Sequence, residues 1–257
     1  MSLVKVIEAL SLPPDACVNQ RVPKKLLFEQ DIPTAADKRQ IQDGIEEMIW
    51  VAALKPTNIG VPIFKDNVRE YLEIAVITTK LHISAKPTRI IELIHRAIPY
   101  PVVLITSVGE SGCLSLAHKR WSQGEIGKVV IEDIRRTHDF IPEALNTEEA
   151  SFIASLKISD LPNQDLYALY QGLIDCIAAL GASKISGKFA LPSSKVQAHL
   201  LSDNLDEHAR IQREIIMLRA KAEKEKQLNR RVELNLEIKR LEEELAATKD
   251  KLRIGET

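Results

Sequence analysis

The sequence predicts an α/β (α+β) protein with a mixed β-sheet of about four to five strands packed by helices, followed by a long coiled-coil-like helix. Short apolar runs rich in β-branched residues, between residues 48 and 106, predict the strands. One helical run lies between two of these strands, and a tight glycine turn follows them. The stretch from Asn204 to Ile254 has no glycine or proline, and it therefore predicts the long helix.

The composition is that of a soluble globular protein of one or two domains. The chain has 257 residues, of which 45% are hydrophobic and 28% are charged. Only 4% are aromatic, which argues against a stacking surface for single-stranded nucleic acid. The formal net charge of -1 argues against a surface wholly committed to a polyanion, but it is compatible with a local basic patch.

The cysteines and the N-terminus indicate a cytoplasmic protein. Cys17, Cys113 and Cys176 are far apart and odd in number, which suits a reduced compartment. The first residues lack the apolar region of a signal peptide. We find no apolar run that approaches the roughly 20 residues needed to span a bilayer. We therefore expect a soluble protein of the cytoplasm.

Residues 1–47 form a predicted N-terminal helical segment in which prolines separate short helices. Pro23 suits the first turn of a helix that carries Leu26. Thr34 is a good N-cap for the next helix, and Asp37 favours the first turn of that helix through the helix dipole.

The predicted α/β core domain spans residues 48–188 and begins with a strand over residues 48–54. A second strand covers residues 71–80, and a helix opens at Pro87. A strand over residues 102–106 follows that helix. A strand–helix–strand step of this kind normally makes a right-handed crossover to a parallel neighbour, so we expect the second and third strands to be parallel.

The second half of the core domain completes the sheet and then turns helical. Residues 110–112 make a tight turn into a strand over residues 113–119, which forms a hairpin and adds an antiparallel edge. Residues 128–131 add one more strand. Thr147 is the predicted N-cap of the next helix, and a further helix runs from Leu166 to Ala182.

Residues 189–203 are a predicted linker, and residues 204–257 are a predicted charged helix of the coiled-coil type. The interaction seam of this helix consists of two runs of apolar residues at alternating spacings of four and three, followed by one residue a heptad later: Ile211, Ile215, Leu218 and Ala222, then Leu234, Ile238, Leu241 and Leu245, then Leu252. A seam this narrow cannot bury itself and needs another helix. We expect either a homo-oligomer or a helical partner protein, and the alternative is packing on the chain's own domain.

The two halves of the seam do not share one heptad register, because the later half is shifted by two positions. One interpretation is a continuous helix with a local change of supercoil, and this is the interpretation that we favour. The other is a bend near residues 228–231 that folds the helix back as an antiparallel hairpin. An antiparallel pair would also place the basic first half beside the acidic second half.

The basic first half of this helix is a candidate for phosphate contacts, since such contacts require only accessible lysine and arginine side chains. The candidate residues are Arg210, Arg213, Arg219, Lys221, Lys224, Arg230 and Arg231. A smaller basic cluster near the N-terminus contains Arg21, Lys24 and Lys25. Most such charge runs are solvated helix faces.

The catalytic candidates are Glu73, Lys80 and His118, which would surround the edge of the sheet in a divergent metal-dependent nuclease. Restriction-type nucleases need an acidic residue followed, two positions later, by lysine. Ala75 stands at that position after Glu73, so the pattern fails where it is most specific. The histidines show no zinc-ligand spacing, and Cys113 is expected to be a core residue. We predict no metal site and no cofactor.

Several segments resemble one bacterial family over almost the whole chain. They are residues 69–77, 95–102 and 116–120, together with Val22–Leu26 and Glu225–Asn235. The family is catalogued as domain of unknown function forty-three ninety-one. Its members are often encoded beside Swi/Snf-type helicases and DNA methyltransferases, so the resemblance implies a partner that acts on DNA.

These observations lead us to expect a non-catalytic accessory or scaffold subunit of a bacterial restriction or phage-defence complex. The C-terminal helix would assemble it with a partner, which the resemblance implies is a helicase or a methyltransferase. The alternatives are the metal-dependent nuclease and a protein that contacts DNA through the basic half of the C-terminal helix.

Overall fold

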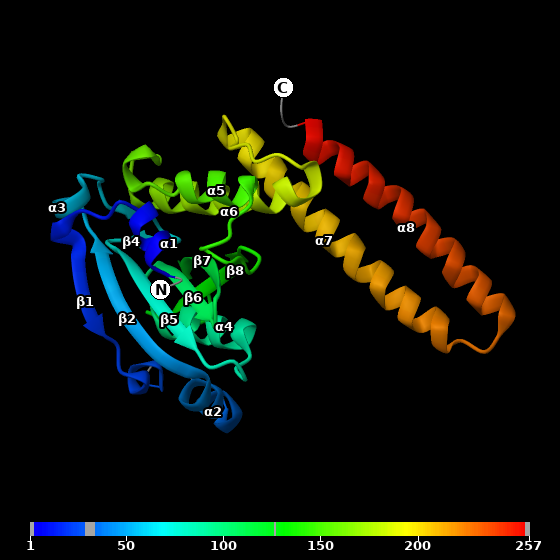
Figure 1. Ribbon diagram of the computed structural model, residues 1–257, viewed down its shortest axis with the longest axis horizontal. Helices are drawn as coiled ribbons and strands as arrows, with labels where there is room; N and C mark the ends of the chain where they lie inside the picture. Colours follow the sequence, from blue (N-terminus) through cyan, green and yellow to red (C-terminus); the bar gives the residue numbers. More distant parts are fainter. Residues whose placement is uncertain (1–2, 29–33, 126, 255–257) are drawn as a thin grey trace. The chain divides into compact units, whose positions relative to one another are not determined.

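Figure 1 shows a computed structural model of the chain, which describes residues 3–28, 34–125 and 127–254. The chain divides into two compact units, Met1–Ile177 and Ala178–Thr257. The first unit contains a mixed sheet with helices, and the second is helical. The predicted α/β (α+β) class is confirmed.

The main sheet has six strands in the order β1-β2-β5-β6-β7-β8. These strands are β1 (Cys17–Arg21), β2 (Ile45–Leu54), β5 (Ile74–Leu81), β6 (Val102–Val108), β7 (Ser111–Trp121) and β8 (Val129–Arg136). Neighbours are antiparallel except β5 and β6, which are parallel. The predicted crossover and the antiparallel hairpin that follows it are therefore confirmed. A separate two-stranded ladder joins β3 (Phe64–Lys65) to β4 (Glu70–Tyr71).

Helices lie in several of the connections between strands, and they form most of the second unit. In chain order they are α1 (Val4–Ala9), α2 (Ala35–Gly44), α3 (Pro56–Ile59), α4 (Pro87–Ala97), α5 (Thr147–Ala154), α6 (Leu166–Ser186), α7 (Lys195–Lys224) and α8 (Leu228–Ile254). Short 3₁₀ helices cover Pro14–Ala16, Lys24–Phe28 and Ile158–Asp160.

Helix ends follow the sequence signals closely. The Thr34 hydroxyl accepts a hydrogen bond from the Asp37 N–H at 3.1 Å, which confirms Thr34 as the N-cap of α2. The cap of α5 is Asn146 rather than the predicted Thr147. Asn146 and Glu149 form a capping box in which each side chain accepts a hydrogen bond from the other residue's N–H.

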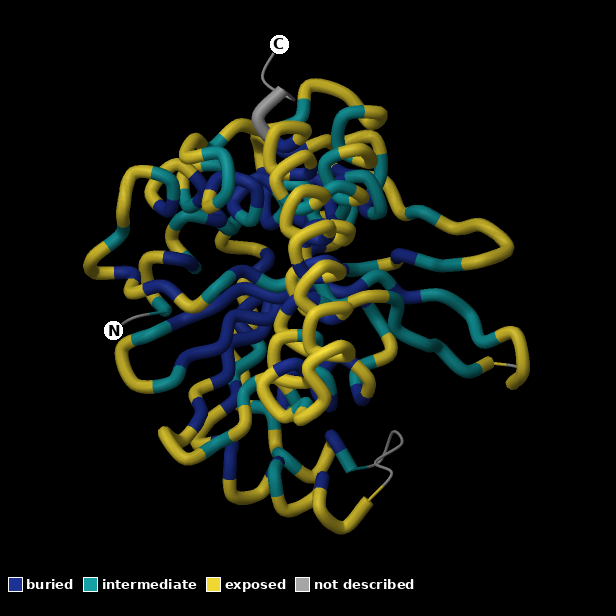
Figure 2. Tube along the Cα trace, turned by 90° about the vertical axis from the view of Figure 1, so that its right-hand side faces the viewer, coloured by how far each residue is buried: buried dark blue, intermediate teal, exposed yellow. Residues whose placement is uncertain are grey.

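An apolar core lies between α4 and the sheet, and Ile90, Ile94, Ile77 and Leu104 are among its buried residues. Figure 2 shows the strands of the sheet largely in the colour of buried residues. Beyond the sheet, the buried Tyr170 of α6 ties this helix to two strands. Its hydroxyl accepts from the Ala117 N–H at 2.9 Å and donates to the Val102 carbonyl at 2.8 Å.

The N-terminal segment differs from the helical prediction, because residues 17–21 form the edge strand β1. All residues of β1 are exposed, so no apolar alternation marks the strand in the sequence. The strand predicted over residues 71–80 also begins later, at Ile74. Tyr71 belongs instead to the small ladder formed by β3 and β4.

The predicted continuous C-terminal helix is wrong, and so is the extent of its linker. Two helices, α7 and α8, are separated by residues 225–227, and α7 already begins at Lys195 with Ser194 as its N-cap. The helices are antiparallel, with His208 Nδ1 2.9 Å from the Thr248 hydroxyl (Figure 1). The shift in heptad register therefore marks a reversal of the chain near Leu228.

Among the described residues, one helix is long and apolar enough, by length and composition, to cross a membrane. This helix is α6, whose 21 residues differ from the expectation that no apolar run approaches the length of a membrane span. About two thirds of its apolar window (67%) is buried inside the protein, as in the core helix of a soluble protein.

Candidate functional site

The three catalytic candidates do not meet at one point. The Glu73 carboxylate lies 3.0 Å from the Lys55 amine, and the Lys80 amine lies 2.7 Å from the Glu46 carboxylate. Glu73 precedes β5 and Lys80 lies near its end, and an extended strand separates residues at this spacing by about 20 Å. The arrangement that a metal-dependent nuclease requires is therefore not formed. Within the described residues, no group of three or more His, Cys, Asp or Glu residues is placed to hold a metal ion.

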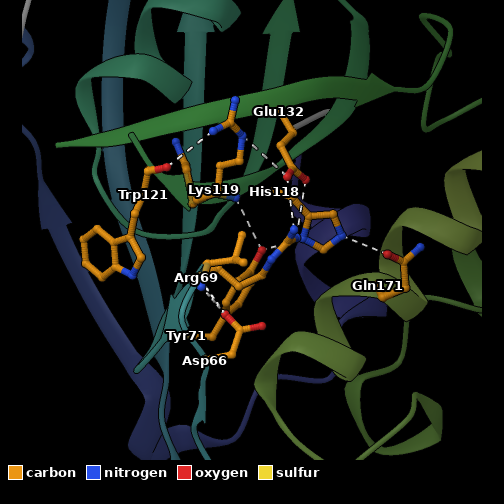
Figure 3. A network of polar contacts seen from close by, with 10 residues as sticks. Asp66, Arg69, Tyr71, His118, Lys119, Trp121, Glu132 and Gln171 are labelled. Carbon is orange, nitrogen blue, oxygen red and sulfur yellow. Dashed lines mark hydrogen bonds and ion pairs between the residues drawn. The ribbon is translucent and has the colours of Figure 1, made fainter. Parts of the chain in front are cut away.

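His118 lies in a polar network of its own (Figure 3). The Gln171 amide donates to the Asp175 carboxylate at 2.8 Å, so its oxygen faces His118 and accepts from Nε2–H at 2.8 Å. Nδ1 is then an acceptor, and the Tyr71 hydroxyl donates to it at 2.5 Å. Burial lowers the pKa of His118, and burial also raises the pKa of Tyr71. Both ring nitrogens of a neutral His118 are thus occupied within the protein.

A fixed arginine closes the same network. The two terminal nitrogens of Arg69 donate to the two carboxylate oxygens of Glu132 at 3.1 and 3.4 Å, and the guanidinium lies 5.1 Å from the centre of the Tyr167 ring. Tyr167 and Tyr170 both contact the His118 ring. These side chains form a hydrogen-bonded and stacked polar cluster. The contacts of the cluster hold the Arg69 guanidinium in one orientation, and they leave both ring nitrogens of His118 occupied.

The distance between Nε2 of a second histidine, His95, and the Ser115 hydroxyl oxygen is 3.1 Å. This is the distance expected between a general base and the nucleophile that it activates. Both residues are completely buried, and burial lowers the pKa of His95 to about 3. The buried amine of Lys119 donates to the backbone carbonyls of His95 and Ile98, where α4 ends. No substrate reaches this pair, so we assign these residues to the core.

A cavity of about 410 Å³ opens beside the polar network. Residues from the approach to β5, from the connection between α4 and β6, and from the ends of β7 and β8 line it. The lining includes the cationic side chains of Arg69 and Arg120, the side chain of Lys119, and the aromatic side chains of Tyr100 and Trp121. Its size falls in the range of small-molecule sites, roughly 300–1,000 Å³.

In the second unit, the predicted interaction seam is buried inside the α7–α8 hairpin. The seam residues of α7 pack against those of α8 in one core cluster: Ile211, Ile215, Leu218, Ala222, Leu234, Ile238, Leu241 and Leu245. Leu252 is buried as well. The two halves of the seam therefore pack against each other within the same chain. Assembly with another protein would have to use a different surface of the hairpin.

The basic candidates divide into two groups. Arg210 forms ion pairs with Glu207 and Glu214, Arg213 donates to the Ala209 carbonyl, and Arg219 pairs with Glu242 across the hairpin. The cations near the turn are exposed and form no ion pair with any described residue. We call this group the basic tip, and it consists of Lys221, Lys224, Lys226, Arg230 and Arg231.

The hairpin also carries an apolar face that the sequence analysis missed. Leu228, Val232 and Leu236 of α8 are 64%, 49% and 64% exposed. They recur every four residues, which places them on one side of a helix. We call this set the outer stripe of α8. The spacing was visible in the sequence, but the stronger Leu234–Leu245 pattern concealed it.

Comparison with known proteins gives one family. The family model described as Domain of unknown function (DUF4391) matches residues 10–245. The chain belongs to this family. No curated protein and no solved structure matches the chain. The family match covers most of both units and carries no description of an activity.

Proposed function

We propose that this DUF4391 protein is a non-catalytic accessory subunit of a bacterial restriction or phage-defence complex. In this proposal the outer stripe of α8 binds an acidic helical segment of a partner protein in the cytoplasm. The observation that carries the proposal is the exposure of Leu228, Val232 and Leu236 on a helix whose opposite side is already packed.

The geometry of α8 supports a second helix contact. Val232 and Leu234 are two residues apart, which corresponds to a rotation of about 200° around the helix axis. Leu234 packs on α7, so Val232 faces away from α7. Apolar side chains at one-turn spacing are the usual anchors for packing against another helix. A helix with apolar residues on both sides is suited to the interior of a helical assembly.

Charge around the stripe supports a foreign acidic partner over a second copy of the chain. The basic tip adjoins Leu228 and has no carboxylate partners within the described residues. A second copy packed antiparallel about Val232 would bring Arg231, which flanks the stripe, within about one helical turn of the same residue in the first copy. Like charges at that spacing are unfavourable, whereas an acidic segment would neutralise them.

The family supports a partner that acts on DNA. The chain belongs to the DUF4391 family. The resemblance implies that members of this family are often encoded beside helicases and DNA methyltransferases. Such neighbourhood is an associational argument and does not identify the partner. The separate ion pairs of Glu73 and Lys80 give the nuclease alternative no support.

The experiment uses the full chain purified together with a Swi/Snf-type helicase or a DNA methyltransferase, the two kinds of partner that the resemblance implies. Complex formation is measured by gel filtration with light scattering and by titration. A triple variant carries Leu228→Gln, Val232→Gln and Leu236→Gln. We expect it to bind the partner at least about a hundredfold more weakly, because buried apolar anchors dominate such interfaces.

The matched control removes exposed apolar area from the other helix by Ile216→Gln and Met217→Gln, which are 65% and 66% exposed. It should bind the partner like the unchanged chain. If the unchanged chain and the control form a homodimer and the triple variant does not, the outer stripe binds a second copy of the chain rather than a foreign partner. An unchanged affinity of the triple variant would refute the outer stripe as the binding surface.

A second candidate function, contact with DNA through the basic tip, is favoured by the unpaired cations at the turn. If several of them each neutralise a phosphate, the logarithm of the binding constant should fall by about 0.9 per phosphate for each tenfold rise in salt. Replacing all five tip cations with Gln should weaken duplex binding and flatten this salt dependence. Fluorescence anisotropy measures both quantities.

The control for the basic tip removes cations elsewhere on the hairpin, by Arg210→Gln, Arg240→Gln and Lys251→Gln. DNA binding that weakens in proportion to the number of cations removed, whichever set is replaced, would reflect overall charge and would contradict a specific role of the tip.

A further inference from the structure

We propose that the cavity lined by the approach to β5, by Pro99 and Tyr100, and by the ends of β7 and β8 binds a small aromatic phosphate of the size of a nucleoside monophosphate. The proposal concerns the first unit alone and is independent of the hairpin. It rests on the charges and aromatic rings that converge on the cavity and on the way these groups are held.

Two arginines at the cavity share one carboxylate. Arg69 donates to both oxygens of Glu132, whereas Arg120 places its Nε 3.9 Å from the same carboxylate. Among the described residues, Arg120 makes one further polar contact, a long hydrogen bond of 3.4 Å from Nη1 to the Trp121 carbonyl. Arg120 therefore retains strong donors, and its planar guanidinium suits a phosphate group.

The acidic residues that line the cavity are already neutralised. The Glu70 carboxylate lies 2.6 Å from the Lys65 amine, and the Glu73 carboxylate lies 3.0 Å from the Lys55 amine. Arg69 and Arg120 share the single carboxylate of Glu132, which leaves an excess of positive charge at the cavity. The cavity is therefore electrostatically suited to an anion.

The remaining walls suit a flat apolar group. Tyr100 and Trp121 both line the cavity, and each is partly exposed. Their rings offer faces on which an aromatic base stacks without a specific hydrogen-bond pattern. An aromatic ring with an attached phosphate would contact the aromatic side chains and the arginines at the same time, whereas inorganic phosphate would contact only the arginines.

Trp121 provides a direct readout of binding. The chain has two tryptophans, so the Trp50→Phe variant of the full chain leaves Trp121 as its single tryptophan. Adenosine, guanosine, cytidine and uridine monophosphates are each titrated into this variant. We expect at least one to change the Trp121 fluorescence saturably, with half-saturation below about 1 mM.

Three comparisons test the assignment. Adding Arg120→Gln should weaken that binding by about tenfold or more, since a charge-assisted hydrogen bond to phosphate is lost. Adding Arg96→Gln, which removes another partly exposed arginine in the same unit, should leave the affinity unchanged. The matching nucleoside without phosphate should bind about tenfold more weakly than its monophosphate.

The proposal is overturned by any of three results. One is the absence of a saturable change with all four monophosphates up to about 5 mM. The second is equal affinity for nucleoside and monophosphate. The third is equal affinity in the Arg120→Gln and Arg96→Gln proteins, with circular dichroism confirming that both are folded.

Discussion

Replacing Leu241 with aspartate is expected to unfold the α7–α8 hairpin. Leu241 is 2% exposed and packs in the seam with Ile215 and Ile238. An ionised carboxylate without a partner in an apolar seam costs several kcal/mol, and removal of the leucine side chain costs about 2–5 kcal/mol more. Antiparallel helices held by a single narrow seam have little stability beyond that amount.

Amide hydrogen exchange followed by mass spectrometry measures this effect segment by segment. The Leu241→Asp protein should lose protection over residues 195–254 and should lose helical signal in circular dichroism. Leu236→Asp is the matched control, because this leucine is 64% exposed and its replacement keeps the carboxylate in water. Equal protection in the two variants would mean that the seam does not hold the hairpin together.

The buried amine of Lys119 is expected to make the stability of the protein rise with pH above neutrality. Burial lowers the pKa of Lys119 from 10.5 to about 7. Between these two values, the unfolded chain binds a proton that the folded chain does not bind. The free energy of unfolding therefore increases with pH through this window and becomes independent of Lys119 below about pH 7.

The measurement compares urea unfolding of the unchanged chain and of Lys119→Met at pH 7 and pH 9. A full effect over two pH units amounts to about 2.7 kcal/mol, and the carbonyls of His95 and Ile98 reduce it by stabilising the ammonium form. The Lys119→Met protein should lack this increase, whereas Lys80→Met, at an exposed ion pair, should retain it. Equal pH dependence in the unchanged chain and Lys119→Met would show that Lys119 stays protonated when folded.

The sequence predicted the centre of the sheet well. The apolar runs at β5 and β6 are buried on both faces, and Pro87 opens the helix between them, so local pattern and tertiary environment agree. The Thr34 cap and the hairpin of β6 and β7 are set by short-range signals of the same kind. The seam residues, which we expected to meet another helix, pack between α7 and α8, with Leu218 and Leu245 partly buried.

The partners of these elements were decided by tertiary structure. β1 is exposed along its length and exists as a strand because β2 offers it an unpaired edge. We expected Glu73 and Lys80 to lie around the same edge of the sheet. An extended strand holds them far apart, and each forms an ion pair with a different residue. Arg69, Lys119 and Arg120 come together only because the approach to β5 and the end of β7 meet.

The C-terminal region shows the same division most clearly. Its sequence by itself determined a helical, charged segment with a narrow apolar seam, since helix period and composition are local properties. Whether the seam would meet a second chain or its own other half depended on a turn at residues 225–227, which contains neither glycine nor proline. Only the packed hairpin decided this, because burying Ile215 against Leu241 stabilises a reversal that no turn residue announces.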